Sequence, residues 1–159
     1  MAQLPLELPA LDPATVNASH GSNYPEQFKP RVAGRGKQKL GDALGLKNFG
    51  VNLTTIKPGA ASALRHWHAK QDEFIYVISG ELVLVTDAGE QLLTAGLCAG
   101  FPAGNADAHH LVNRATRDAV YLEVGDRTPG EAATYPDDDI AARAVDGGWK
   151  FFRKDGTPY

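Results

Sequence analysis

Cysteine is nearly absent from the chain: Cys98 is the one thiol among 159 residues. A single cysteine cannot form a disulfide within the chain, so a cystine-stabilised scaffold is excluded and a reducing compartment fits. Basic blocks are absent as well, because 16 Lys and Arg residues are interspersed among 19 Asp and Glu residues. Nucleic-acid binding usually leaves a stripe of basic residues, so the sequence argues against a nucleic-acid partner.

Long hydrophobic runs are also missing. The N-terminal segment 1–14 contains leucines, but prolines interrupt them and no basic residue precedes them. The segment therefore resembles neither a secretion signal nor a membrane-spanning helix, and we expect a cytoplasmic protein with no membrane partner. A length of 159 residues fits one domain with a sizeable core.

What the chain does contain is a series of short alternating segments that begins at Phe49. Gly- or Pro-containing turns separate these segments from one another. Many short strands at this spacing are typical of a sandwich or barrel, so we predict an all-β fold. The expected strands are 49–56, 63–68, 73–78, 81–86, 91–93, 97–101, 108–113 and 119–124.

The segments on either side of the alternating region have no sustained period. Residues 1–47 are rich in Pro, Asn, Ser and Gly and predict an irregular N-terminal arm that packs on or between barrels, with a short helical turn near 36–46. Residues 48–125 are the predicted barrel core. Residues 126–159 predict a short C-terminal extension, one strand and a turn packed outside the barrel, within a single domain.

Four of the five histidines lie between positions 66 and 110. Side chains two apart on a strand project from the same face, so His66 and His68 can converge on one ion. Glu73 starts the next strand after a short polar connection, and a hairpin there would bring its carboxylate beside the two imidazoles. His109 lies on a later strand that a closed sheet can place opposite. The sequence therefore predicts a metal site made of these four residues.

The chemistry of this set favours an active site over a structural one. Three imidazoles and one carboxylate suit a divalent first-row transition metal, namely Fe, Mn, Ni, Zn, Co or Cu. Neutral histidines and one glutamate leave a divalent ion with a net charge of about +1, which attracts an anionic or oxygen-rich ligand. In six-coordinate geometry two positions also stay open.

These residues resemble the two motifs of the cupin superfamily, over about 48–125. The first motif reads Gly59-AASALR-His66-W-His68-AKQD-Glu73-FIYVIS-Gly80. It has one residue more than the family pattern between the first glycine and the first histidine. The second motif reads Gly96-LCAGF-Pro102-A-Gly104-NADA-His109-HLV-Asn113. Here four residues, rather than the two of the family pattern, precede the histidine.

The resemblance implies a double-stranded β-helix, or jelly-roll barrel, with a metal ion near its mouth. The lengthened turn leaves His109 and His110 as alternatives for the last ligand. We favour His109 because it keeps the motif's spacing to Asn113, whereas His110 faces the other side of the strand. The C-terminal stretch is also similar to that of small single-domain bacterial cupins, some of which carry a sugar-phosphate isomerase label.

Other side chains near the motifs also carry expectations, and for Asn113 and Arg65 there are two alternatives each. Asn113 is expected to bond the barrel backbone or to orient a ligand. Arg65 alternates with the ligands and is expected to point away from the ion; if it reached the mouth, it would clamp a carboxylate or phosphate. Phe74 and Tyr76 share one face of their strand and are expected in the core between the sheets.

The predicted site supports two classes of function. We expect a metal-dependent enzyme of dioxygenase, decarboxylase or isomerase type that acts on a small oxygenated metabolite. No general base is evident in the sequence, so the catalytic residues stay unassigned. The alternative is a non-catalytic cupin that binds or senses a small molecule through its ion. Similar cupins commonly pair, and the Pro-rich arm can cover a sheet edge of a partner, so we expect a homodimer.

Overall fold

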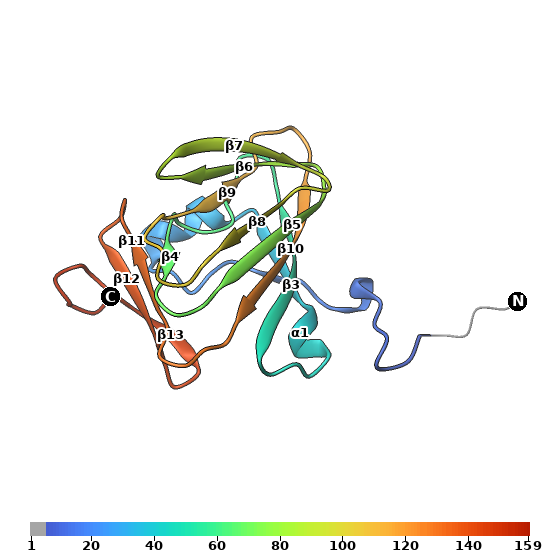
Figure 1. Cartoon of the computed structure of the whole chain (residues 1–159), viewed down its shortest axis with the longest axis horizontal. Helices are drawn as coiled ribbons and strands as arrows, with labels where there is room; N and C mark the ends of the chain where they lie inside the picture. The colour runs from blue at the N-terminus through green and yellow to red at the C-terminus, as the bar shows by residue number, and fades with distance from the viewer. Residues whose placement is uncertain (1–5) are drawn as a thin grey trace, which may run out of the picture.

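The computed structural model of the chain describes residues 6–159, which are mostly antiparallel β-structure (Figure 1). Short 3₁₀ helices span Pro13–Thr15 and Glu26–Val32, and the α-helix α1 spans Leu40–Ala43. None of the helices in this part of the chain has the length and apolar character needed to cross a membrane. The strands are β1 (Ser19–His20), β2 (Arg35–Lys39), β3 (Phe49–Ile56), β4 (Trp67–His68), β5 (Glu73–Ser79), β6 (Glu81–Thr86), β7 (Gly89–Thr94), β8 (Cys98–Phe101), β9 (His110–Val112), β10 (Ala119–Asp126), β11 (Ala132–Tyr135), β12 (Ile140–Val145) and β13 (Gly148–Phe152).

The largest sheet has the strand order β1-β2-β3-β10-β5-β8. Its centre is the antiparallel pair β3 and β10, which align from Phe49 opposite Asp126 to Ile56 opposite Ala119. The strand predicted for 49–56 is therefore confirmed at both ends. A second sheet has the order β7-β6-β9, and a third has the order β13-β12-β11-β4.

The main core lies between the six-stranded and the three-stranded sheets. Its buried side chains come from the inward positions of β3, β5 and β10 on one side and of β6, β7 and β9 on the other. This layering confirms the predicted all-β jelly roll. The largest of these buried residues are Ile56, Ile75, Val77, Leu82, Leu84, Leu93, Leu111 and Tyr121.

A second core joins the N-terminal arm to the C-terminal segment. Phe28 and Val32 of the 3₁₀ helix pack with Tyr135 of β11 and Ile140 of β12. The prediction of one C-terminal strand outside the barrel is therefore wrong, because three strands form there and β11 pairs with β4. All three strands are short, and β11 and β12 are rich in alanine, so they show little hydrophobic period. The helical turn expected near 36–46 is likewise smaller than predicted, since β2 occupies its first part.

Strand β5 exposes large apolar side chains on the outer face of the six-stranded sheet. Phe74, Tyr76 and Ile78 are 41%, 42% and 47% exposed. The expectation that Phe74 and Tyr76 lie in the core is therefore wrong. Both faces of β5 are apolar, so the alternation of side chains does not predict which face packs inward. In the structure the buried face is that of Ile75 and Val77.

Candidate metal centre

The first and second motifs meet through backbone pairing between two of the predicted ligands. His66 and His109 form an isolated antiparallel bridge next to β4 and β9. Each residue's backbone N–H donates to the other's carbonyl, with N–O distances of 3.1 and 2.8 Å. Directly opposed residues on antiparallel strands project to the same face. The two side chains therefore lie side by side, with ring centroids 5.1 Å apart.

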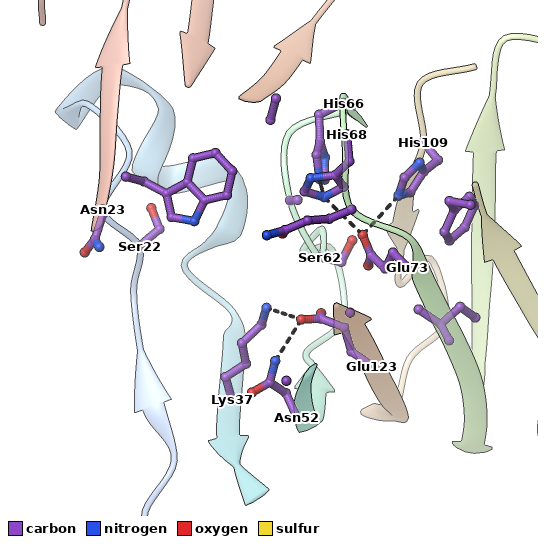
Figure 2. A pocket seen from close by; sticks show the side chains of 18 of the residues that line it. Ser22, Asn23, Lys37, Asn52, Ser62, His66, His68, Glu73, His109 and Glu123 are labelled. Carbon is purple, nitrogen blue, oxygen red and sulfur yellow. Dashed lines mark hydrogen bonds and ion pairs between the residues drawn. The ribbon is translucent and has the colours of Figure 1, made fainter. Parts of the chain in front are cut away.

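The structure places the four predicted ligand residues close together, three of them in one group and His109 beside Glu73 (Figure 2). The Nε2 atoms of His66 and His68 are 3.2 Å apart. Oε2 of Glu73 lies 3.4 Å from Nε2 of His68 and 3.4 Å from Nε2 of His109. Ligand atoms of His66, His68 and Glu73 all lie within 4.8 Å of one another. Glu73 thus stands between the imidazoles of the first motif and that of the second.

The donor set fits a divalent metal ion. Nδ1 of His66 lies 2.8 Å from the carbonyl oxygen of Leu64. A carbonyl only accepts, so the proton sits on Nδ1 and the Nε2 lone pair faces the cluster. The Nε2 atom of His68 faces that lone pair at 3.2 Å, a distance that a shared proton or cation stabilises. The Glu73 carboxylate supplies the negative charge that such a cation requires.

The protonation states agree with this geometry. Burial lowers the pKa of His66 to about 3, so this imidazole stays neutral at physiological pH. Burial also disfavours charge on His68, but the hydrogen bond and charge of Glu73 outweigh it and raise the pKa of His68. Burial alone would raise the pKa of Glu73, yet the bonds from His109 and His68 hold it well below its usual value. Glu73 is therefore a carboxylate at neutral pH.

Aromatic rings hold two of the imidazoles in place. The ring of Phe101 stacks on His109 with centroids 3.5 Å apart and planes inclined by 3°. Tyr135 stacks on His66 with centroids 5.4 Å apart. Sequence reasoning missed both contacts. Tyr135 belongs to the C-terminal strands, and no local pattern connects it with the motifs.

A cavity of about 550 Å³ opens in front of the cluster. On its far side, Oε1 of Glu123 accepts hydrogen bonds from Nζ of Lys37 at 2.7 Å and Nδ2 of Asn52 at 3.0 Å (Figure 2). The Tyr121 hydroxyl donates to Oε2 of Glu123 at 3.2 Å. Sequence reasoning did not find these residues. The one signal for them in the sequence was that Glu123 lies two residues from Tyr121, so that the two side chains share one face of the strand.

Asn113 and Arg65 engage other parts of the protein. Asn113 is fully buried, and its Nδ2 donates to the carbonyl oxygens of Ile56 and Arg117 at 2.7 and 2.8 Å. The guanidinium of Arg65 donates two hydrogen bonds of 2.7 Å to the Asp137 carboxylate. The first side chain therefore ties backbone segments together, and the second anchors a C-terminal loop.

The two adjacent histidines of the second motif point in different directions. His109 lies beside Glu73, as described above. Nδ1 of His110 is instead 3.1 Å from the carbonyl oxygen of Ala63. Of the two alternatives left by the lengthened turn, the structure places His109 in the cluster and His110 outside it.

Comparison with known proteins agrees with this fold. A family model described as the cupin domain matches residues 52–125, which include all four residues of the cluster. No curated protein gives a significant match.

Solved structures give strong matches. A protein from Silicibacter pomeroyi, described as a sugar phosphate isomerase from a cupin superfamily, is 47% identical, with 95% of this chain and 96% of that chain covered and a TM-score of 0.91. A second, from Acidithiobacillus ferrooxidans, is 30% identical, with coverages of 82% and 83% and a TM-score of 0.74; its description as a sugar phosphate isomerase is provisional.

A polyketide cyclase from Streptomyces resistomycificus shares the fold at 21% identity, with 77% of this chain and 82% of that chain covered and a TM-score of 0.63. The two stronger matches cover most of the chain at 30% identity or more, and the motif residues lie together in the structure. Both observations show the family to which the chain belongs. The chain belongs to the cupin superfamily.

Proposed function

We propose that the chain is a metal-dependent enzyme that acts on a small oxygenated metabolite, with sugar phosphates as the favoured substrate class. One observation carries the proposal: donor atoms of His66, His68 and Glu73 converge within 4.8 Å on the wall of a cavity large enough for such a molecule. These residues and His109 would hold one divalent first-row ion. The imidazole and carboxylate donors suit Fe, Mn, Ni, Zn, Co or Cu.

His66, His68, Glu73 and His109 would hold the ion, whose Lewis acidity would polarise a substrate oxygen and stabilise negative charge on it. The chain's own residues then bind and orient the substrate. Lys37 and Asn52 present N–H donors on the far side of the cavity, and Glu123 presents a carboxylate acceptor. A polyhydroxylated ligand that spans the cavity meets donors and acceptors at both ends, which limits its orientation.

Acidic and basic side chains both line the cavity. Of the four basic ones, Lys37 and Arg127 pair with Glu123 and Asp42, whereas Arg35 and Lys39 form no ion pair within the described residues, and these two support a phosphorylated substrate. Cationic groups near the mouth attract an anion and can accept its phosphate oxygens. The description of the 47% identical protein as a sugar phosphate isomerase supports the same substrate class, and it is our reason for proposing isomerisation rather than decarboxylation or dioxygenation.

The proposal is tested by screening pentose and hexose phosphates with the protein loaded in turn with Mn²⁺, Fe²⁺, Co²⁺, Ni²⁺ and Zn²⁺. We expect turnover with at least one ion and a loss of at least about 100-fold in His68→Ala, because the variant removes a ligand. His20→Ala is the matched control, since His20 is exposed on β1 outside the cluster. Binding of the substrates without turnover would favour the alternative, a sensing cupin, and contradict the enzyme.

We also propose that the chain forms a homodimer through the outer face of the six-stranded sheet. Phe74 and Tyr76 stand beside the half-buried Val124 and Leu122 of β10 in the sheet register, so these four side chains form a continuous apolar patch without formal charge. An apolar, uncharged face can meet its own copy across a twofold axis without like-charge repulsion. The first described residues, which include Leu8 at 71% exposed, extend away from the body of the chain and can add cover (Figure 1).

Light scattering at micromolar concentration tests the dimer. The wild type should have twice the mass of one chain, and Tyr76→Glu should be monomeric, because the variant buries a charge at the centre of the contact. Leu92→Glu is the control, since Leu92 is 56% exposed on β7 of the other sheet. A monomeric wild type would end this proposal.

A cytoplasmic location is likewise proposed, supported by the single exposed thiol of Cys98.

Metal affinity should fall on acidification. A metal ion competes with the proton on an imidazole nitrogen, and the raised pKa of His68 keeps that proton in place to a higher pH than the usual value of about 6.5. His66, with a pKa of about 3, releases no proton on binding above about pH 5. Calorimetry with Zn²⁺ in buffers of different ionisation heat should therefore show more protons released at pH 6 than at pH 8. Equal release at both values would refute this assignment.

A further inference from the structure

Glu131 is a buried carboxylate at the start of the C-terminal strands, and it is only 1% exposed. Its side chain accepts hydrogen bonds from the backbone N–H groups of Ala69 at 2.8 Å, Lys70 at 3.1 Å and Ala132 at 2.7 Å. Burying a carboxylate is costly unless hydrogen bonds compensate. Three N–H donors stabilise this charge where it is.

The backbone that Glu131 holds connects two residues of the cluster. Ala69 and Lys70 begin the connection between His68, at the end of β4, and Glu73, at the start of β5. The N–H of Ala69 also donates to the carbonyl of Ala132 at 2.9 Å, which extends the pairing of β4 with β11. A single side chain from a distant part of the sequence therefore fixes the segment that sets the distance between two of the four residues.

The imidazole of His68 has one ring nitrogen that the cluster does not use. Its Nδ1 is buried and makes no hydrogen bond within the described residues. Oε1 of Glu131 lies 3.8 Å from this atom, which a small ring rotation would bring to hydrogen-bond length. A neutral imidazole that ligates through Nε2 must carry its proton on Nδ1, and a buried N–H without an acceptor costs free energy.

We propose that Glu131 is a positioning residue of the metal centre. It accepts the Nδ1–H of His68, which fixes the ring and strengthens Nε2 as a ligand, and it fixes the connection from His68 to Glu73. Carboxylates that accept from the second nitrogen of a ligating histidine have this effect in metal sites generally. The inference rests on the metal dependence in the proposed function, but it concerns metal affinity and does not depend on which substrate is turned over.

The competing explanation is that Glu131 only stabilises the turn after β4. The two explanations predict different metal affinities for the folded protein in the absence of substrate. If Glu131 only stabilises the turn, its loss lowers the stability of the metal-free protein and leaves the metal affinity of the folded state unchanged. If Glu131 is a positioning residue, its loss also lowers that affinity and changes the coordination geometry.

The test compares Glu131→Gln with wild type in Zn²⁺ competition against a chromophoric chelator, at a temperature where the metal-free proteins are folded. We expect the affinity to fall by about 10- to 100-fold, and the visible spectrum of the Co²⁺-loaded form to change. Asp137→Asn is the matched control, because Asp137 is another C-terminal carboxylate and binds Arg65, the neighbour of His66. An affinity of Glu131→Gln within about twofold of wild type would overturn the proposal.

A second measurement needs no variant and so covers the case in which Glu131→Gln fails to fold. In the Zn²⁺-loaded wild type with ¹⁵N-labelled histidine, the Nδ1–H of His68 should give a low-field proton signal that exchanges slowly with water. Rapid exchange of that proton would overturn the proposal. If the wild type binds no Zn²⁺, the proposed function fails with it, whereas tight binding with equal affinity in both proteins removes only the role of Glu131.

Discussion

The backbone pairing of His66 with His109 is the constraint on which the candidate site depends. Two reciprocal hydrogen bonds join the first motif to the second at this point, although 42 residues separate the partners in the sequence. Because opposed residues share a face, the pairing aligns their imidazoles, and the next residue of the same parity, His68, follows from strand geometry. Glu73 then enters from β5 and faces all three rings.

The C-terminal strands are part of this site rather than an appendage to the barrel. Strand β11 pairs with β4 and places Tyr135 against the ring of His66. Glu131 holds the backbone that follows His68. Trp149 and Phe151 of β13 line the cavity in front of the cluster. Loss of these strands would therefore remove one wall of the cavity as well as part of the support of the imidazoles.

The predictable part of the fold was the part with a strict period. Residues 49–56 alternate as far as Leu53 and form β3, although the buried positions of that strand are Thr54 and Ile56 rather than the apolar set that begins at Phe49. His66, His68 and Glu73 follow a spacing that brings their side chains together once the strands form. The prediction that Phe74 and Tyr76 are buried was wrong because both faces of β5 are apolar. In such a strand, the alternation of side chains does not predict which face packs against the core. Glu131 could not be foreseen, because its role comes from three backbone N–H groups that only tertiary pairing brings to it.

We propose that His66, His68, Glu73 and His109 hold one metal ion in a cavity lined by polar, acidic and basic groups. Elemental analysis of untagged protein, purified beside Glu73→Gln, tests it most directly. We expect about one first-row transition metal ion per chain in the wild type and strong depletion in the variant, because the variant removes the carboxylate that balances the ion's charge. A metal-free wild type, or equal metal content in the two proteins, would contradict the account.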